Sequence, residues 1–205
     1  VAANLKGYVR DGGTLVTTFF SGMVNESDLV TLGGYPGELR DLLGIWVEEN
    51  DALPPDETNT IEMVAPLGRL QGSYPCGLLC DVLHAEGAEV LATYGRDYYA
   101  GYPVLTRHRY GQGWACYVAS DPEPAFVADL LGTLCDERGI AAPLAVPAGV
   151  EVTQRHKGDA IYTFVLNHHA KPVRFTLPSP ARDLLSGRDL EGEVDLAGND
   201  VLILT

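Results

Sequence analysis

The sequence predicts two domains of different class, an α/β domain followed by a small antiparallel β domain. First, Thr14–Phe20 (TLVTTFF) has the β-branched and aromatic composition of a strand covered on both faces, as in a parallel sheet. Second, apolar residues recur at helical spacing after Asp121. Third, this helical pattern disappears after the proline-bounded segment Ala141–Pro147, and short strand patterns replace it. We therefore predict domains at residues 1–145 and 148–205.

The chain opens on a helical pattern. Leu5, Tyr8 and Val9 share one face, and Gly12-Gly13 ends the helix. Because the sequence starts inside this pattern, we expect it to be a fragment, with the preceding strand and any targeting signal outside it.

The middle of the α/β domain has weaker signals. Pro36–Gly44 predicts a short helix whose leucines form one stripe and whose last glycine ends it. Residues 47–60 are acidic and contain prolines, so we expect a surface loop. We expect an edge strand at Ile61–Leu67, a short helix at Asp81–Glu86 and a strand at Ala88–Tyr94.

The clearest unit of the α/β domain is a hairpin followed by a helix. Val104–Tyr110 and Trp114–Ala119 flank a Gly-Gln-Gly turn. Asp121 then fits a helix N-cap with Pro122 at the first helical position, and Gly139 closes the helix.

The second domain contains only strand patterns. Their turn residues recur every several positions, which predicts a small antiparallel fold that is marginally stable by itself. The expected strands are Val150–Arg155, Ile161–Leu166, Val173–Leu177, Glu193–Leu196 and Val201–Leu204.

Composition excludes several classes of partner. With 14 Lys and Arg against 28 Asp and Glu, the net charge of −14 repels phosphate backbones, so we expect no nucleic acid. No apolar run reaches the length of a membrane span, so we expect no membrane partner. The glycine pairs lack phosphate-binding spacing, and we expect no cofactor. Four cysteines indicate free thiols in a reducing compartment, here the cytoplasm.

Three long segments carry a family resemblance in the same order along the chain. They are Gly12–Glu49 (GGTLVTTFFSGMVNESDLVTLGGYPGELRDLLGIWVEE), His84–Ser120 (HAEGAEVLATYGRDYYAGYPVLTRHRYGQGWACYVAS) and Gly149–Leu177 (GVEVTQRHKGDAIYTFVLNHHAKPVRFTL). Together they resemble the trimerisation domain and C-terminal domain of glycoside hydrolase family 42 β-galactosidases.

The resemblance implies a doubly wound, amidotransferase-like (flavodoxin-like) sheet domain followed by a small β domain. In that family both lie C-terminal to a catalytic (β/α)8 barrel, and the present chain has no barrel pattern. The implied role is non-catalytic: the chain holds the barrels of a retaining β-galactosidase, which hydrolyses terminal β-D-galactosides, in a homotrimer. The partners implied are a second copy of the chain and its own barrel.

The predicted interface lies in the loop Ser21–Pro36. Partners of open α/β sheets gather at the carboxyl ends of strands, and this loop leaves the strand that we expect at the centre of the sheet. The candidate contact residues, which also border a neighbouring active site in this hypothesis, are Phe20, Met23, Asn25, Glu26, Asp28 and Leu29.

A tyrosine group in TYGRDYYAGYPVLT extends this prediction. We expect two of Tyr94, Tyr98, Tyr99 and Tyr102 to pack in the core. Because tyrosine is enriched at interfaces, Tyr98, Tyr99 and Tyr102 are further candidates for a subunit contact. A carbohydrate-binding module that uses the tyrosines is an alternative.

Other residues suggest catalysis or metal binding. Asn25-Glu26 resembles the acid/base pair of the related barrels, but it lies in a single loop, so we expect no catalytic role. Cys76, with Gly77 after it and His84 nearby, permits a free-standing amidotransferase-like hydrolase as a second alternative. Cys76, Cys80 and His84 recur every four residues, but a zinc site needs a fourth ligand, so we expect no metal.

Overall fold

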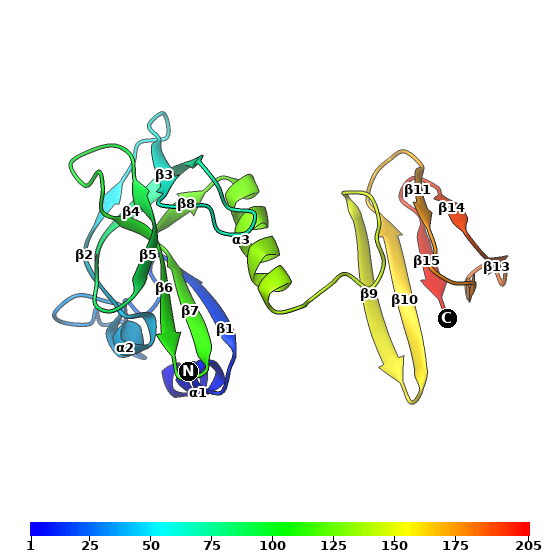
Figure 1. Ribbon diagram of the computed structural model, residues 1–205, viewed down its shortest axis with the longest axis horizontal. Helices are drawn as coiled ribbons and strands as arrows, with labels where there is room; N and C mark the ends of the chain where they lie inside the picture. The colour runs from blue at the N-terminus through cyan, green and yellow to red at the C-terminus, as the bar shows by residue number, and fades with distance from the viewer. The chain divides into compact units, whose positions relative to one another are not determined.

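The computed structural model describes residues 1–205, and the chain divides into two compact units, Val1–Arg138 and Gly139–Thr205. In Figure 1 the first unit runs from blue to green, and the second from light green to red. None of the helices combines the length and the apolar character required to cross a membrane.

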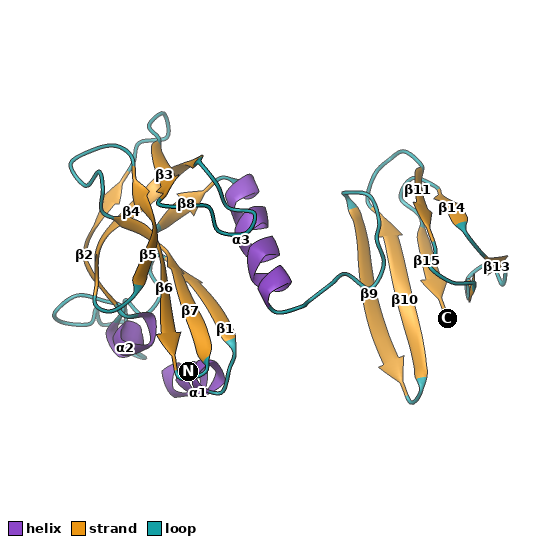
Figure 2. Cartoon of the chain, in the orientation of Figure 1, coloured by secondary structure: helices purple, strands orange, loops and turns teal.

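The first unit is built on one mixed sheet of eight strands (Figure 2). The order is β1-β7-β6-β5-β3-β4-β2, and β8 pairs with β4. The bounds are β1 (Thr14–Thr18), β2 (Ile45–Ala52), β3 (Asn59–Met63), β4 (Ser73–Ala85), β5 (Glu89–Tyr94), β6 (Pro103–Tyr110), β7 (Gly113–Val118) and β8 (Ser120–Pro122).

The doubly wound, flavodoxin-like arrangement is not confirmed. Only β1 and β7 pair in parallel, and every other pair in this sheet is antiparallel. Adjacent strands such as β5, β6 and β7 are joined directly by turns, so few helices are needed as crossovers. The strand expected at the centre, β1, forms an end of the strand order.

Helices cover both faces of this sheet. They are α1 (Ala2–Arg10), the 3₁₀ turn η1 (Gly37–Leu39), α2 (Arg40–Leu43) and α3 (Pro124–Glu137). Neighbouring residues of β6 point to opposite faces: His108 Nδ1 lies 3.0 Å from the carbonyl oxygen of Leu42 in α2, whereas Arg107 pairs with Glu137 at the end of α3. The strand β6 is therefore packed on both sides.

The predicted helix ends are confirmed where glycine decides them. Gly44 ends α2 in the left-handed conformation, and Gly139, also at positive φ, follows α3. The predicted start of α3 is wrong by two residues. Glu123 is the N-cap and Pro124 the first helical residue, because Asp121 and its neighbours pair with β4 as strand β8.

Three further predictions are wrong in the middle of the unit. Much of the expected loop 47–60 belongs to β2, an edge strand whose acidic residues Glu48 and Glu49 face solvent while Val47 is buried. The expected helix Asp81–Glu86 is the end of β4, whose residues 79–83 are all buried. In addition, β3 lies between β5 and β4 rather than at an edge. Tertiary burial overrides local propensity at all three places.

The second unit contains only antiparallel strands. Strands β15 (Val201–Leu204), β10 (Ala160–Asn167) and β9 (Val150–Lys157) form one sheet. Two smaller ladders pair β11 (Val173–Thr176) with β14 (Glu193–Leu196), and β12 (Ala181–Arg182) with β13 (Asp189–Leu190). The five predicted strands are confirmed, and the two-residue strands β12 and β13 were not predicted. The core residues are Leu144, Val165, Phe175, Leu177, Val194, Leu196, Leu202 and Leu204.

Candidate subunit interface

The loop that follows β1, residues 21–36, folds as an ordered hairpin; we call it the hairpin loop. Val24 and Val30 form an antiparallel bridge, and the amide of Thr31 donates to the carbonyl of Met23 at 2.9 Å. At its tip the side-chain oxygen of Asn25 accepts from the amides of Ser27 (2.9 Å) and Leu29 (3.1 Å). An Asn that caps its own turn in this way favours a tight reversal of the chain. Asn25 therefore shapes the tip.

The hairpin loop presents apolar side chains to solvent. Leu29 is 65% exposed and Leu32 is 96% exposed, and Val24 and Val30 are exposed as well. The acidic residues of the loop, Glu26 and Asp28, are also exposed. Several large apolar side chains gathered on one exposed segment are typical of a protein–protein contact. The loop therefore has the chemistry of an interface with an acidic rim.

The two candidates nearest to β1 differ from the tip residues. Phe20 is half exposed, has positive φ and packs edge-on against Phe19, with ring centroids 5.5 Å apart. Met23 is partly buried and packs against the core of the first unit. Of these two residues, Phe20 offers more of its side chain to a partner.

The base of the hairpin loop is anchored on strand β2. The indole Nε1 of Trp46 donates to the carbonyl of Gly33 at 2.9 Å, and the amide of Val47 donates to the carbonyl of Tyr35 at 2.7 Å. A Cβ on Gly34 would lie 1.9 Å from Nε1 of Trp46. Only glycine permits this approach, because the backbone also has positive φ there.

A row of aromatic rings continues from this anchor across β2 and β4. Trp46 stacks on His84 with centroids 4.9 Å apart, and the ring of Tyr102 meets His84 edge-on at 5.8 Å. His84 Nε2 lies 2.7 Å from a carboxylate oxygen of Glu48. The row therefore connects Tyr102, 38% exposed, to the base of the hairpin loop. Sequence reasoning missed Trp46 and His84 as members, because their contact depends on the pairing of β2 with β4.

The tyrosine group divides into two pairs. Tyr94 and Tyr99 are fully buried and pack edge-on at 4.9 Å, as expected for two of the four. Tyr99, one of the interface candidates, donates its hydroxyl to Asp51 at 2.9 Å and has no exposed surface for a partner. Tyr98 is 66% exposed and donates to Glu49 at 2.6 Å, which raises the pKa of Tyr98 to about 12.

Tyr35, near the end of the hairpin loop, contacts a buried carboxylate of strand β4. Asp81 of β4 is fully buried. It accepts hydrogen bonds from the hydroxyls of Tyr35 (2.7 Å) and Tyr117 (2.6 Å) and from the side-chain amide of Asn50. Burial raises the pKa of Asp81 above its ordinary value, although these hydrogen bonds oppose the shift.

The residues that suggested catalysis are not assembled into a catalytic site. Glu26 is exposed at the tip of the hairpin loop. Cys76 lies on β4 and is 3% exposed, and hydrogen bonding to Cys80 together with burial raises the pKa of the Cys76 thiol. No hydrogen bond joins Cys76 to a histidine, whereas His84 pairs with Glu48. A protonated, buried thiol without a base lacks the properties of a nucleophile.

No three side chains of the metal-binding types come together in this structure. The four-residue spacing of Cys76, Cys80 and His84 falls on strand β4 rather than on a helix. Both cysteines are buried, while His84 belongs to the aromatic row described above.

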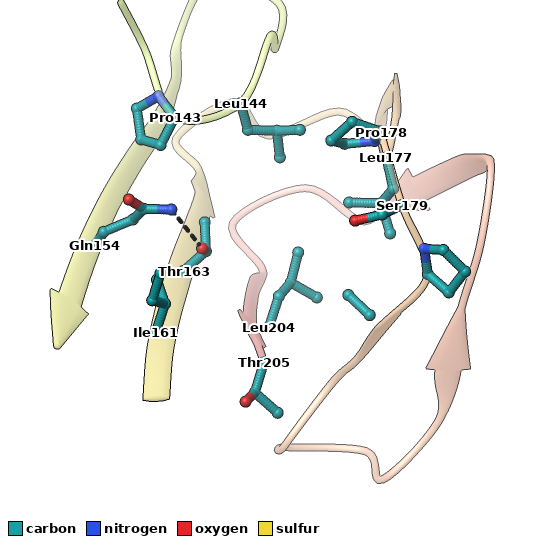
Figure 3. Close-up of a pocket in the computed structure, with 12 residues that line it drawn as sticks. Pro143, Leu144, Gln154, Ile161, Thr163, Leu177, Pro178, Ser179, Leu204 and Thr205 are labelled. Carbon is teal, nitrogen blue, oxygen red and sulfur yellow. Dashed lines mark hydrogen bonds between the residues drawn. The ribbon is translucent and has the colours of Figure 1, made fainter. Parts of the chain in front are cut away.

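The second unit has a groove of about 260 Å³. Figure 3 shows Leu144, Leu177 and Leu204 among the residues around it, and the amide of Gln154 donating to the hydroxyl of Thr163 at 3.0 Å. The lining contains no carboxylate, imidazole or thiol side chain. The groove therefore lacks the groups that acid–base or thiol catalysis requires. Elsewhere in the second unit, the side-chain amide of Asn167 donates to the carbonyls of Lys171 and Ala197.

Two domain families match almost the whole chain. Residues 1–141 match the family described as "Beta-galactosidase trimerisation domain", and residues 149–205 match "Beta-galactosidase C-terminal domain". Among curated relatives, the β-galactosidase BgaP of Planococcus sp. (strain L4) is 53% identical over 204 residues, which is 99% of this chain and 30% of that protein. The β-galactosidase BgaB of Geobacillus sp. (strain Y412MC61) is 39% identical over 98% of the chain and 30% of its own length.

Solved structures agree with these matches. The β-galactosidase from Bacillus circulans sp. alkalophilus superposes with a TM-score of 0.95 at 52% identity, covering 99% of this chain and 30% of that one. The β-galactosidase from Rahnella sp. R3 superposes with a TM-score of 0.91 at 37% identity, covering the full chain and 30% of that one. The chain thus spans about a third of the length of the relatives that it matches. The chain belongs to the glycoside hydrolase family 42 β-galactosidases, and its two units correspond to their trimerisation and C-terminal domains.

Proposed function

We propose that this chain assembles a β-galactosidase as a homotrimer, with the hairpin loop as the main contact between subunits. The observation that carries the proposal is the exposed apolar tip of an ordered loop: Leu29 and Leu32 lie in solvent while the base is hydrogen-bonded to Trp46 and Val47. An ordered apolar surface binds a partner at a lower entropic cost than a flexible one.

The contact surface in this proposal has two parts. The hairpin loop supplies Leu29 and Leu32 as apolar contacts, and Phe20 adds one just before the loop; Asn25, Glu26 and Asp28 form the polar rim. Tyr102 extends the surface along the aromatic row, and the exposed Tyr98 adds a second tyrosine. Tyrosine suits a contact because it combines a large apolar ring with a hydroxyl. The small β domain, residues 148–205, is a non-catalytic cap.

The activity belongs to the whole protein in this proposal. The catalytic barrel supplies both carboxylates and hydrolyses terminal β-D-galactosides, and the present chain brings a loop from one subunit to the border of the neighbouring active site. The absence of a catalytic constellation around Glu26 and Cys76 supports a structural role. The four free thiols agree with a cytoplasmic location.

Sedimentation velocity over a dilution series tests the proposal. We expect the chain to sediment as a trimer at high concentration, and we expect Leu29→Asp combined with Leu32→Asp to shift it to a monomer. Two buried interfacial charges without partners weaken binding by several kcal/mol, or on the order of a hundredfold or more.

The matched control is Leu185→Asp, since Leu185 on the second unit is 58% exposed, close to the 65% of Leu29. It should leave the trimer intact. A wild-type chain that stays monomeric at every concentration, or a trimer that tolerates the double substitution, contradicts the assignment.

A further inference from the structure

The buried carboxylate of Asp81 connects three strands to the hairpin loop. Its donors come from the end of the loop (Tyr35), from β2 (Asn50) and from β7 (Tyr117). The donors stand 46, 31 and 36 residues away along the chain. Asp81 is therefore a hub at which the loop and the sheet meet.

The hub has no cation to offset its charge. The polar groups that face Asp81 are Tyr35, Tyr117 and Asn50 at the carboxylate, and Tyr94, whose hydroxyl donates to the main-chain carbonyls of Asp81 and Ala119. A buried carboxylate held only by neutral donors is a costly element, and apolar residues of similar volume often stabilise a core at least as well. Its contribution is directional: it fixes where the donors point.

Tyr35 is the donor that connects Asp81 to the hairpin loop. Its ring is buried, its hydroxyl binds Asp81 and its carbonyl accepts from Val47. The start of the loop also meets its end, because a Cβ on Gly22 would lie 2.2 Å from the carbonyl oxygen of Pro36. Fixing Tyr35 therefore fixes both ends of the hairpin loop.

We propose that Asp81 is a positioning residue for self-association, which orients the hairpin loop through Tyr35 so that its apolar tip is presented in one arrangement. This inference rests on the proposed function of the loop. A residue that only stabilised the core would affect the loop equally through Tyr35 and Tyr117. In this proposal, the bond from Tyr35 orders the loop and the bond from Tyr117 does not.

Two substitutions separate these roles. Tyr35→Phe and Tyr117→Phe each remove one hydroxyl from the same carboxylate and leave the ring in place. Both should lower the melting temperature, and Tyr35→Phe should lower it more, because the Tyr35 hydroxyl also accepts from the side-chain amide of Asn50. We expect Tyr35→Phe alone to raise the amide hydrogen exchange of residues 21–36 about tenfold and to weaken the trimer about tenfold. Tyr117→Phe should leave both quantities within about twofold of wild type.

Equal effects of the two variants on loop exchange overturn the proposal. Asp81→Asn provides a second variant that keeps the shape of the hub and one carbonyl acceptor for Tyr35, so its loop exchange should fall between wild type and Tyr35→Phe. If the wild-type chain proves monomeric, the proposed function fails, but the exchange measurement still decides whether Asp81 and Tyr35 position the loop.

Discussion

Each unit of the molecule buries one aspartate, and the two are held in opposite ways. Asp81 in the first unit is bound by side chains that are remote in sequence. Asp183 in the second unit is 2% exposed and is bound mainly by its own turn: the hydroxyl and amide of Ser186 and the amide of Leu185 donate to it, together with the amide of Ile203. One carboxylate organises tertiary structure, and the other organises a local turn.

The pKa values of the two aspartates shift in opposite directions. Burial raises the pKa of Asp81 more than its three neutral side-chain donors lower it. Burial also acts to raise the pKa of Asp183, but the hydrogen bonds from Ser186, Leu185 and Ile203 outweigh it, and the pKa lies below the ordinary value. Backbone amides around a turn stabilise a carboxylate strongly because several of them converge on it. The comparison shows that burial alone does not set the ionisation of a buried acid.

The largest expected effect comes from deleting each carboxylate. Asp81→Ala leaves the buried hydroxyls of Tyr35 and Tyr117 without their acceptor and removes one of the two acceptors of Asn50, so we expect a loss of about 4 kcal/mol in the free energy of unfolding. Asp183→Ala should cost about 2 kcal/mol, because water reaches the amides of the exposed residues Leu185 and Ser186.

Urea denaturation measures both losses. Both tryptophans, Trp46 and Trp114, lie in the first unit, so their fluorescence reports Asp81→Ala without interference from the second unit. Amide NMR signals of β9 and β10 report Asp183→Ala. A larger loss for Asp183 than for Asp81 would reverse the comparison.

A smaller effect concerns the anchor of the hairpin loop. Gly33 and Gly34 have nearly equal positive φ values of 86° and 87°, but only Gly34 has a neighbour within reach of an added Cβ. Gly33→Ala should cost about 1 kcal/mol for backbone strain alone. Gly34→Ala should cost roughly 3 kcal/mol, because the indole of Trp46 has to move and its hydrogen bond to the loop is lost.

The same tryptophan fluorescence titration measures this pair. A red shift of the emission in the native state should accompany Gly34→Ala only. Equal losses for the two variants would mean that the approach of Trp46 to the loop does not contribute to stability.

The smallest effects, and the sharpest in sign, are on pH dependence. The raised pKa of Asp81 means that the native state holds its proton more tightly than the unfolded chain, so its contribution to stability falls as pH rises from about 4 through the native pKa. The lowered pKa of Asp183 means the reverse: its contribution is complete above about pH 4 and is lost as pH falls through the native pKa.

Asparagine variants isolate these two contributions. The stability difference between wild type and Asp81→Asn should shrink as pH increases from 4, and the difference for Asp183→Asn should shrink as pH decreases below 4. Denaturant titrations at half-unit pH steps measure both slopes. If both stability differences changed with pH in the same direction, the opposite pKa shifts of Asp81 and Asp183 would be refuted.

The parts of the fold that sequence reasoning predicted correctly have local signals. The hairpin of β6 and β7, the glycine stops after α2 and α3, and the five strands of the second unit all follow from residues within a few positions of one another. The turn at Asp183 has the same local character, since its serine partner is three residues away.

The parts that it missed depend on distant partners. A helix was expected at Asp81–Glu86 because the local pattern does not reveal that β2, β3 and β8 all pair with β4. Tyr99 was expected at the surface, yet it is buried against Tyr94 and binds Asp51. The aromatic row was not predicted, because Trp46 and His84 come together only when β2 pairs with β4.

By itself, the sequence determined the family and the order of an α/β part and a small β part, and it predicted the segment proposed here as the interface. Long sequence motifs identify a family even where the secondary structure of the same residues is predicted wrongly. Only the tertiary structure decided which strands share a sheet, which tyrosines are exposed and how Asp81 holds the loop. The physical reason is that burial and hydrogen-bond direction at Asp81 arise from residues 31 to 46 positions away, and no local propensity encodes where those residues meet.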